Sequence, residues 1–361
     1  MKTTIDKPAG GKKRFLWSLL FFVIAALSVW AVMSQAKGFS PKRFLAYLDH
    51  NNPWWLGAAV LAMLSYIGFD ALMIGCLLKD FGYPRSLPKC FSYAAADIYF
   101  SAITPSATGG QPMEAWFMTK DGVPAIISTV VVLTYLLLYT LSIVIIGLLC
   151  LVLVPSSFLA FGTFGRILII IGAVIQLALA FLYAMLLWNK DMLRKICDFG
   201  LRLLAKLRII RNLERREAKL QTTMDQYAAA TELLKGRHKL LLKTLLLNLA
   251  HRGSQILVTV FCFLAGGGPC RLAPKLFAMQ SNVVLGAYCI PIPGSMGVTD
   301  LLMLDGFSSL MSEGRAASLE LLARSASFYI CILLCGALVL IKYARFRLRK
   351  EPEQAIQEHS K

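Results

Sequence analysis

The chain has 361 residues, of which 57% are hydrophobic and 16% charged, and its formal net charge is +18. This composition excludes an ordinary soluble globular protein and indicates a polytopic membrane protein. The cations cluster between apolar runs, as the orientation of membrane helices by cytoplasmic Lys and Arg requires. The charge therefore indicates topology and contact with anionic lipid, and we expect no nucleic-acid binding.

Six apolar runs are long enough to cross a bilayer core of about 30 Å. They follow a cytoplasmic tail over 1–14 and cover about 15–33, 54–78, 124–154, 166–188, 240–264 and 316–341. A basic tail over 342–361 follows the last run, so both termini are expected on the cytoplasmic side. We therefore expect an all-α polytopic fold with a first membrane half over 15–188 and a second over 240–341.

The polar segment 189–239 separates the two halves and carries thirteen Lys or Arg against six Asp or Glu. Apolar residues recur at helical spacing between Met192 and Ile210, with basic residues between them. This pattern predicts either a basic amphipathic helix on the inner leaflet or a helix packed on the cytoplasmic ends of the spans. The segment is also where a cytosolic partner would dock.

Two stretches, 90–118 and 276–303, interrupt the apolar pattern with prolines, glycines and a following carboxylate. The marking residues are Thr104, Pro105, Gly109, Gly110 and Glu114 in the first stretch, and Pro293, Gly294, Gly297 and Asp300 in the second. Broken backbone at membrane depth is tolerated only where it is buried in protein or lines a cavity. Paired interruptions in corresponding halves indicate a transporter binding site, and we expect two re-entrant elements that enter from opposite faces, as in an inverted repeat.

The candidates among the charged residues of the expected membrane segments are Asp70, Asp97, Glu114, Arg252, Asp300 and Arg324. A charge at the bilayer centre costs at least about 2.5–3.5 kcal/mol, so each is a functional candidate. Asn248 and Gln255 share one helix face with Arg252, because they stand at i, i+4 and i+7. In one interpretation the arginines bind a phosphate and the carboxylates compensate charge or receive an ammonium group. In the other, the arginines hold the broken helices to Asp300 or Glu114, or these two carboxylates cap helix starts.

Enzyme signatures are sparse. The sequence contains no H-E-x-x-H, G-x-S-x-G or P-loop pattern, and its four histidines are scattered. We therefore expect no catalytic residue, no metal and no cofactor. His251 is the one histidine inside a span, and it is expected to be either a helix-contact residue or part of a proton relay.

Three features together resemble the lysylphosphatidylglycerol synthase transmembrane region, also called the flippase-like family. They are ITPSATGGQPMEAW over 103–116, CIPIPGSMGVTD over 289–300, and Arg324 in the last span. The resemblance extends over about 15–341. It implies a protein of the bacterial cell membrane that is linked to aminoacylated phospholipid and to resistance against cationic peptides. Glu114 and Arg324 stand where the family's motifs carry Glu and Arg, whereas Asp300 replaces the usual Glu and is one methylene shorter.

The full-length synthase of this family also has a cytosolic domain that transfers lysine from lysyl-tRNA to phosphatidylglycerol. The segment 189–239 is too small to hold such a domain, and the sequence ends shortly after its last span. We therefore expect a translocator that moves a phospholipid, either phosphatidylglycerol or its lysyl derivative, between leaflets. Arg252 and Arg324 are expected to bind the phosphate. The alternatives are a phosphatidylglycerol lysyltransferase, alone or with a cytosolic partner, and a transporter of polyprenyl phosphate or glycolipid.

Overall fold

The computed structural model describes residues 51–104, 109–189, 192–195, 213–288, 295 and 297–359. Within them, five helical runs are long and apolar enough to cross a membrane. They are α3 (Pro53–Asp80), α6 (Ala125–Leu153), α8 (Thr163–Trp188), α11 (His238–Ala265) and the run Glu313–Phe346. The all-α polytopic membrane fold is thereby confirmed. The expected span over 15–33 and the tail over 1–14 lie outside the described residues.

Shorter helices occupy the interrupted stretches and the connections. They are α4 (Leu87–Ile103), α5 (Gly110–Lys120), α7 (Pro155–Leu159), α10 (Leu213–Glu232), the 3₁₀ turn η2 (Cys270–Leu272), α12 (Ala273–Ala287) and α13 (Val298–Phe307). The run Glu313–Phe346 comprises α14 (Glu313–Arg324), a π-helical turn η4 (Ser325–Tyr329) and the described first part of α15 (Ile330–His359).

The outward faces of the spans are apolar. On α8, for example, Phe164, Ile167, Val174 and Phe181 are all exposed. A continuous exposed apolar surface of this kind would be unfavourable in water, whereas lipid tails cover it at no cost in hydrogen bonding. The sequence therefore buries its polar groups between the helices and presents its hydrocarbon to the bilayer.

Two sets of contacts define the two ends of the helix bundle. At one end, the Asn52 N–H donates to the Ala265 carbonyl (3.0 Å), which joins the start of α3 to the end of α11. The Gly162 N–H at this end donates to Oδ2 of Asp305 (2.9 Å), and we call this the Asp305 end. At the other end Arg237, before α11, forms an ion pair with Asp80 at the end of α3. We call it the Asp121 end.

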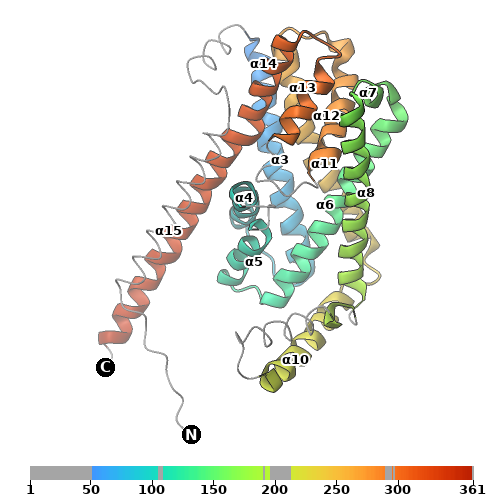
Figure 1. Cartoon of the computed structure of the whole chain (residues 1–361). Coiled ribbons are helices and arrows are strands. Elements are labelled where there is room, and N and C mark those ends of the chain that lie inside the picture. Colours follow the sequence, from blue (N-terminus) through green and yellow to red (C-terminus); the bar gives the residue numbers. More distant parts are fainter. Residues whose placement is uncertain are drawn as a thin grey trace. The chain divides into compact units, whose positions relative to one another are not determined.

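The two interrupted stretches form helix pairs that start from opposite ends. The α4–α5 hairpin follows the end of α3 and finishes where α6 begins, so it enters and leaves at the Asp121 end. The α12–α13 hairpin follows the end of α11 and finishes near Asp305, so it enters and leaves at the Asp305 end. Figure 1 shows α12 and α13 near α14, and α4 with α5 farther along α3. This is the arrangement expected of two re-entrant elements, and the side of the membrane on which each end lies stays a prediction.

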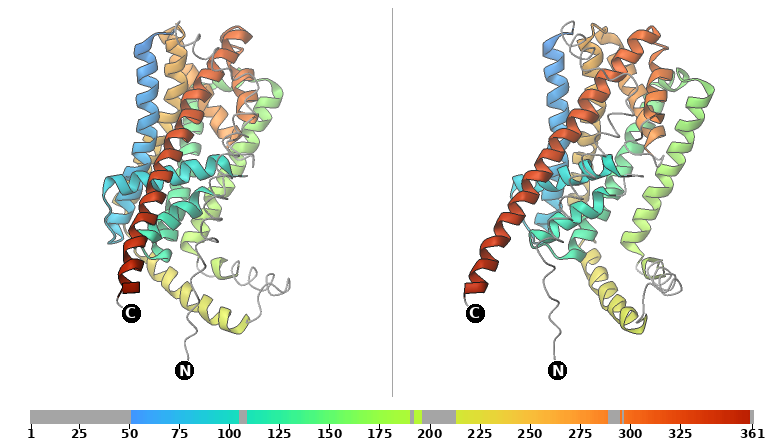
Figure 2. Two further views of the ribbon diagram at one scale, coloured as in Figure 1. Left: turned by 90° about the vertical axis from the view of Figure 1, so that its left-hand side faces the viewer. Right: turned by 60° about the vertical axis from the view of Figure 1, so that its left-hand side comes forward.

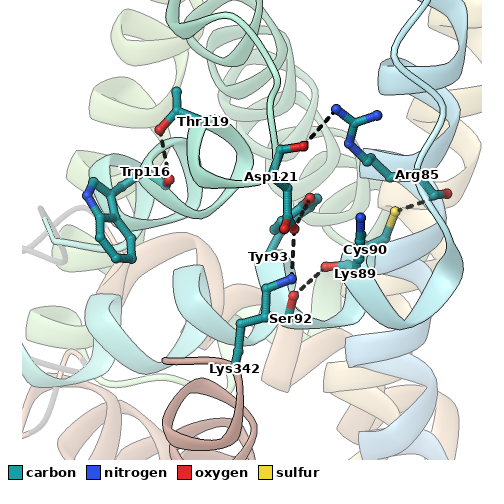
Figure 3. Close-up of polar contacts among 9 residues, drawn as sticks. All are labelled: Arg85, Lys89, Cys90, Ser92, Tyr93, Trp116, Thr119, Asp121 and Lys342. Atoms are coloured by element: carbon teal, nitrogen blue, oxygen red, sulfur yellow. Dashed lines mark hydrogen bonds and ion pairs between the residues drawn. The ribbon is translucent and has the colours of Figure 1, made fainter. Parts of the chain in front are cut away.

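Asp121 fastens the base of the α4–α5 hairpin (Figure 3). Its Oδ2 accepts hydrogen bonds from Lys342 Nζ on α15 (2.7 Å) and from the Tyr93 hydroxyl on α4 (2.6 Å), and its carbonyl accepts from Arg85 Nη2 (3.0 Å). Burial opposes ionisation of Asp121, but the Lys342 and Tyr93 contacts outweigh it, so its pKa lies below its usual value. In both views of Figure 2, α15 runs past this hairpin, and the two are in contact.

The described part of segment 189–239 includes α10, which packs on the spans. The Tyr227 hydroxyl donates to the Leu186 carbonyl of α8 (3.0 Å), and Tyr227, Ala230 and Leu234 are buried. A helix packed on the ends of the spans therefore exists in this segment. The amphipathic run from Met192 to Ile210 lies mostly outside the described residues.

Candidate functional site

Four of the predicted charged residues converge from four different helices. Asp70 comes from α3, Asp97 from α4, Glu114 from α5 and Arg252 from α11, and all four are buried. Arg252 stands near the middle of its 28-residue helix, so the group lies deep in the bundle. We call these four residues the central cluster.

Arg252 lies between aromatic rings and has no ion-pair partner among the described residues. Its guanidinium carbon is 4.4 Å from the centre of the Tyr139 ring and 5.1 Å from that of Tyr288, distances typical of cation–π contacts. Nη1 donates to Oε1 of Gln255, whose Nε2 donates to the Tyr288 hydroxyl (2.8 Å). Nε and Nη2 have no hydrogen-bond partner in the described part of the chain. Two donors of a fixed, fully buried cation are therefore available to an anion.

The three carboxyl groups of the cluster differ in their partners. Both oxygens of Asp70 and both of Glu114 lack a hydrogen-bond partner among the residues that the structure describes. Asp97 accepts hydrogen bonds from the Ser101 hydroxyl (3.3 Å) and the Tyr135 hydroxyl (3.4 Å). Asp70 interacts electrostatically with Asp97 and Arg252, and Glu114 with Asp97 and Asp70. Unpaired carboxylates so deeply buried are costly, so this centre is built for something other than stability.

The break between α4 and α5 brings Glu114 close enough to Asp97 for an electrostatic interaction. Thr104 Oγ1 donates to the Phe100 carbonyl (2.6 Å) and accepts from the Gly109 N–H (2.9 Å), which satisfies backbone groups on both sides of the break. Gly110 then packs directly on α4, where an added Cβ would lie 2.0 Å from Ser101 Oγ and 2.2 Å from Asp97 Oδ1. Pro105 lies outside the described residues. A glycine at position 110 is thus required for the close approach of the two helices.

The remaining polar residues of α11 face its neighbours in the bundle. Asn248 Nδ2 donates to the Thr244 carbonyl (3.4 Å) and contacts the Met73 sulfur of α3. His251 Nδ1 lies 2.8 Å from the Tyr66 carbonyl, and its ring stacks on Tyr66 with centroids 4.1 Å apart. His251 therefore makes the helix contact that was one of its two expected roles.

Arg324 and Asp300 form a separate centre near the start of α13. Arg324 Nε lies 3.0 Å from Asp300 Oδ1, and the guanidinium carbon lies 4.6 Å from the Phe328 ring centre. Asp300 Oδ2 also accepts from the N–H of Gly297 (3.0 Å), which has a φ of +79° that suits glycine. Pro293 and Gly294 lie outside the described residues. Asp300 thus serves both as a helix cap and as the partner of Arg324.

The structure groups the predicted residues differently from the sequence analysis. Arg324 pairs with Asp300, as the interpretation of arginines as helix fasteners proposed, whereas Arg252 pairs with no described carboxylate. No contact between the two arginines is recorded in the described residues, so a phosphate held by both stays a prediction. The π-helical turn that follows Arg324 is a feature often found at functional sites.

Sequence reasoning missed the aromatic surroundings of Arg252. The tyrosines concerned are Tyr66, Tyr135, Tyr139 and Tyr288. Tyr135 and Tyr139 stand four residues apart and are the two aromatic residues of the span 125–153, and this spacing was the available signal. Glu320 was also missed, and it interacts electrostatically with Asp300 and Arg324.

Two comparisons with known proteins bear on this site. A family model described as the lysylphosphatidylglycerol synthase TM region matches residues 15–335. A UPF0104 membrane protein of Pyrococcus horikoshii is 24% identical over 308 residues, which cover 78% of this chain and 86% of the relative. The matched region includes every residue of the central cluster and the Arg324–Asp300 pair.

Proposed function

The chain belongs to the family of the lysylphosphatidylglycerol synthase transmembrane region, and from this premise we propose that it is a translocator that moves a phospholipid between the two leaflets. The observation that carries the proposal is Arg252: a buried guanidinium in mid-span with two donors that no described residue uses. A charge in this position is expensive and is therefore expected to serve an intramembrane ligand.

A phospholipid head group matches the chemistry of the central cluster. A phosphodiester presents two anionic oxygens, and a guanidinium binds such a pair in a bidentate manner. Tyr139 and Tyr288 flank the Arg252 guanidinium in cation–π contacts. Asp70, Asp97 and Glu114 supply carboxyl groups, of which an ionised one can pair with an ammonium, so phosphatidylglycerol and its lysyl derivative are the proposed substrates.

The two helix hairpins supply the route in this proposal. The α4–α5 break and the end of α12 both approach the cluster, through Glu114 and Tyr288 respectively. A head group that leaves either leaflet would meet polar backbone and side chains instead of hydrocarbon, which lowers the cost of its crossing. Arg324 and Asp300 would line the part of the route near the Asp305 end.

Leaflet exchange in liposomes tests the proposal. Purified protein is reconstituted with head-group-labelled phosphatidylglycerol, and a membrane-impermeant quencher reports the label that reaches the outer leaflet. We expect fast exchange with the wild type and at least a tenfold loss for Arg252→Met, which removes the charge but roughly keeps the volume. Arg252→Lys should lose nearly as much, because lysine cannot form the bidentate contact.

Arg271→Met is the matched control, because Arg271 is exposed in η2 and lies outside the proposed route. Equal exchange by Arg252→Met and wild type would refute the assignment of Arg252. Failure of the wild type to exchange phosphatidylglycerol, lysyl-phosphatidylglycerol or a polyprenyl phosphate would refute the translocator. New lysyl lipid in membranes that carry only this protein would instead support a lysyltransferase.

A further inference from the structure

The central cluster contains more carboxyl groups than its cation can neutralise. Three carboxyl groups and one arginine are buried together, and among the described residues no second Lys or Arg interacts with Asp70, Asp97 or Glu114. Three ionised carboxylates beside one guanidinium would leave two net negative charges inside the membrane. Such an excess is too costly to persist, so two of the carboxyl groups are protonated when no ligand is present.

The hydrogen bonds indicate which carboxyl group keeps its charge. Asp97 accepts from two hydroxyl groups, those of Ser101 and Tyr135, and such donors stabilise a carboxylate. Asp70 and Glu114 receive no hydrogen bond from the described residues, and the attraction of Asp70 to Arg252 is outweighed by its repulsion from Asp97. The resting cluster therefore consists of the Arg252 cation, the Asp97 anion and two neutral acids.

The other titratable groups that face the cluster do not change this balance. They are Tyr66 on α3, Tyr135 and Tyr139 on α6, His251 on α11, Tyr288 after α12, and Cys331 and Cys335 on the last membrane helix. Phenols and thiols are neutral near pH 7. His251 Nε2 has no acceptor among the described residues and the ring lies beside Arg252, so a second proton on it would be unfavourable. Among the described groups that face the cluster, Arg252 is therefore the cation that the carboxyl groups must balance.

We propose that binding of an anionic lipid head group at Arg252 is coupled to uptake of one proton by Asp97. When the phosphodiester anion pairs with Arg252, it neutralises the positive charge that the Asp97 carboxylate had balanced. The cluster would then carry one net negative charge. A proton from water then forms an O–H bond on the Asp97 carboxylate, while the phosphodiester keeps its charge, so the loaded site is again neutral. This inference rests on the proposed lipid substrate and adds the ion that travels with it.

The proposal distinguishes two lipids. Phosphatidylglycerol carries one negative charge and should bind with uptake of about one proton. Lysyl-phosphatidylglycerol brings its own ammonium groups, which can pair with the Asp97 carboxylate and make the proton unnecessary. With one ammonium on the Asp97 carboxylate the number of protons taken up should fall to zero, and a second ammonium inside the site would favour release of a proton from Asp70 or Glu114, so we expect no net uptake for the lysyl lipid.

Isothermal titration calorimetry tests this directly. The full-length protein in detergent is titrated with short-chain phosphatidylglycerol in buffers of different ionisation enthalpy. The slope of the observed binding enthalpy against the ionisation enthalpy of the buffer gives the number of protons taken up. We expect about one proton per bound lipid for the wild type, about none per bound lipid for Asp97→Asn, and about one for Glu313→Gln, a control at an exposed carboxylate. The wild-type comparison of the two lipids needs no variant.

Binding of phosphatidylglycerol without proton uptake would overturn this inference and leave the translocator standing. Normal uptake by Asp97→Asn would refute the role of Asp97, and a sodium requirement in place of uptake would refute the proton. Absence of binding would overturn this inference together with the proposed substrate. Binding with uptake but without leaflet exchange would refute only the translocator.

Discussion

Asp300 performs two tasks with one short carboxylate. Oδ1 faces Arg324 and Oδ2 caps Gly297, at 3.0 Å in each case. The resemblance to the family placed a glutamate here, and the missing methylene raised the question of whether the contacts could form. In this chain the aspartate makes both, because Gly297, the N-cap of α13, lies only three residues before it.

Replacing Asp300 with Asn should therefore destabilise the second hairpin. The change removes the charge partner of a nearly buried arginine, and we expect the free energy of unfolding to fall by about 1–3 kcal/mol. This loss is smaller than for a fully buried pair, because the Asp300 side chain is about a third exposed. Thermal unfolding of Asp300→Asn, Arg324→Gln and the double variant in detergent forms the test. Additive losses in this cycle would show that the two residues do not interact.

Asp121 should make stability depend on pH in acid. Its pKa is lower in the folded protein than in the unfolded chain, so its contribution is fully present above the unfolded value, about 4, and is lost as pH falls through the folded value. The Asp121→Asn variant should unfold at a lower temperature than the wild type at pH 7, and the difference should shrink below about pH 4. Asp225→Asn controls for general effects of acid. If the difference in unfolding temperature between Asp121→Asn and the wild type stayed constant into acid, the role given to Asp121 would be contradicted.

At the scale of elements, the α4–α5 hairpin depends on close contact at one glycine. A Cβ at position 110 would meet both the Asp97 side chain and its carbonyl oxygen, the latter at 2.5 Å. Gly57 on α3 offers the comparison, because nothing lies within 4 Å of a Cβ added there. The same substitution should thus have opposite effects at two helical positions.

Gly110→Ala should lower stability by about 3 kcal/mol through overpacking and should also displace Glu114 from the central cluster. Gly57→Ala should be neutral or stabilising by up to about 1 kcal/mol, because alanine is the better helix former. Thermal unfolding and leaflet exchange measured on both variants provide the check. Similar behaviour of the two would mean that α4 and α5 do not pack as described.

At the scale of the whole molecule, charge predicts orientation. Near the Asp121 end lie Lys79, Arg85, Lys89, Lys120 and Arg237, and the described connections at the Asp305 end carry fewer cations. The positive-inside rule therefore predicts that the Asp121 end lies in the cytoplasm and that η2, with the exposed Cys270, lies outside.

A membrane-impermeant maleimide should accordingly label Cys270 in intact cells, and the label should be lost in Cys270→Ser. Adding Ser86→Cys to that variant places a thiol at the exposed start of α4, at the Asp121 end. This second thiol should react only after the membrane is opened. The reverse pattern would invert the predicted topology.

The sequence by itself determined the membrane class, the described spans to within a few residues, the two interrupted stretches and the charged residues at depth. Each of these follows from local composition, because a bilayer requires about 20 apolar residues per helix and penalises every exception within one segment. The sequence predicted the break at Thr104, Gly109 and Gly110 for the same reason, because a helix break depends on residues that are close together in the sequence.

Only the tertiary structure decided which of these residues meet. Arg324 forms an ion pair with Asp300, whereas Arg252 lies among tyrosines from other helices and interacts electrostatically with Asp70. Lys342 donates a hydrogen bond to Asp121, which lies 221 positions earlier in the sequence. Such pairings depend on how the spans pack and rotate against one another, and packing rests on the shapes of many side chains that share nearly the same hydropathy, so the apolar pattern leaves the partners open.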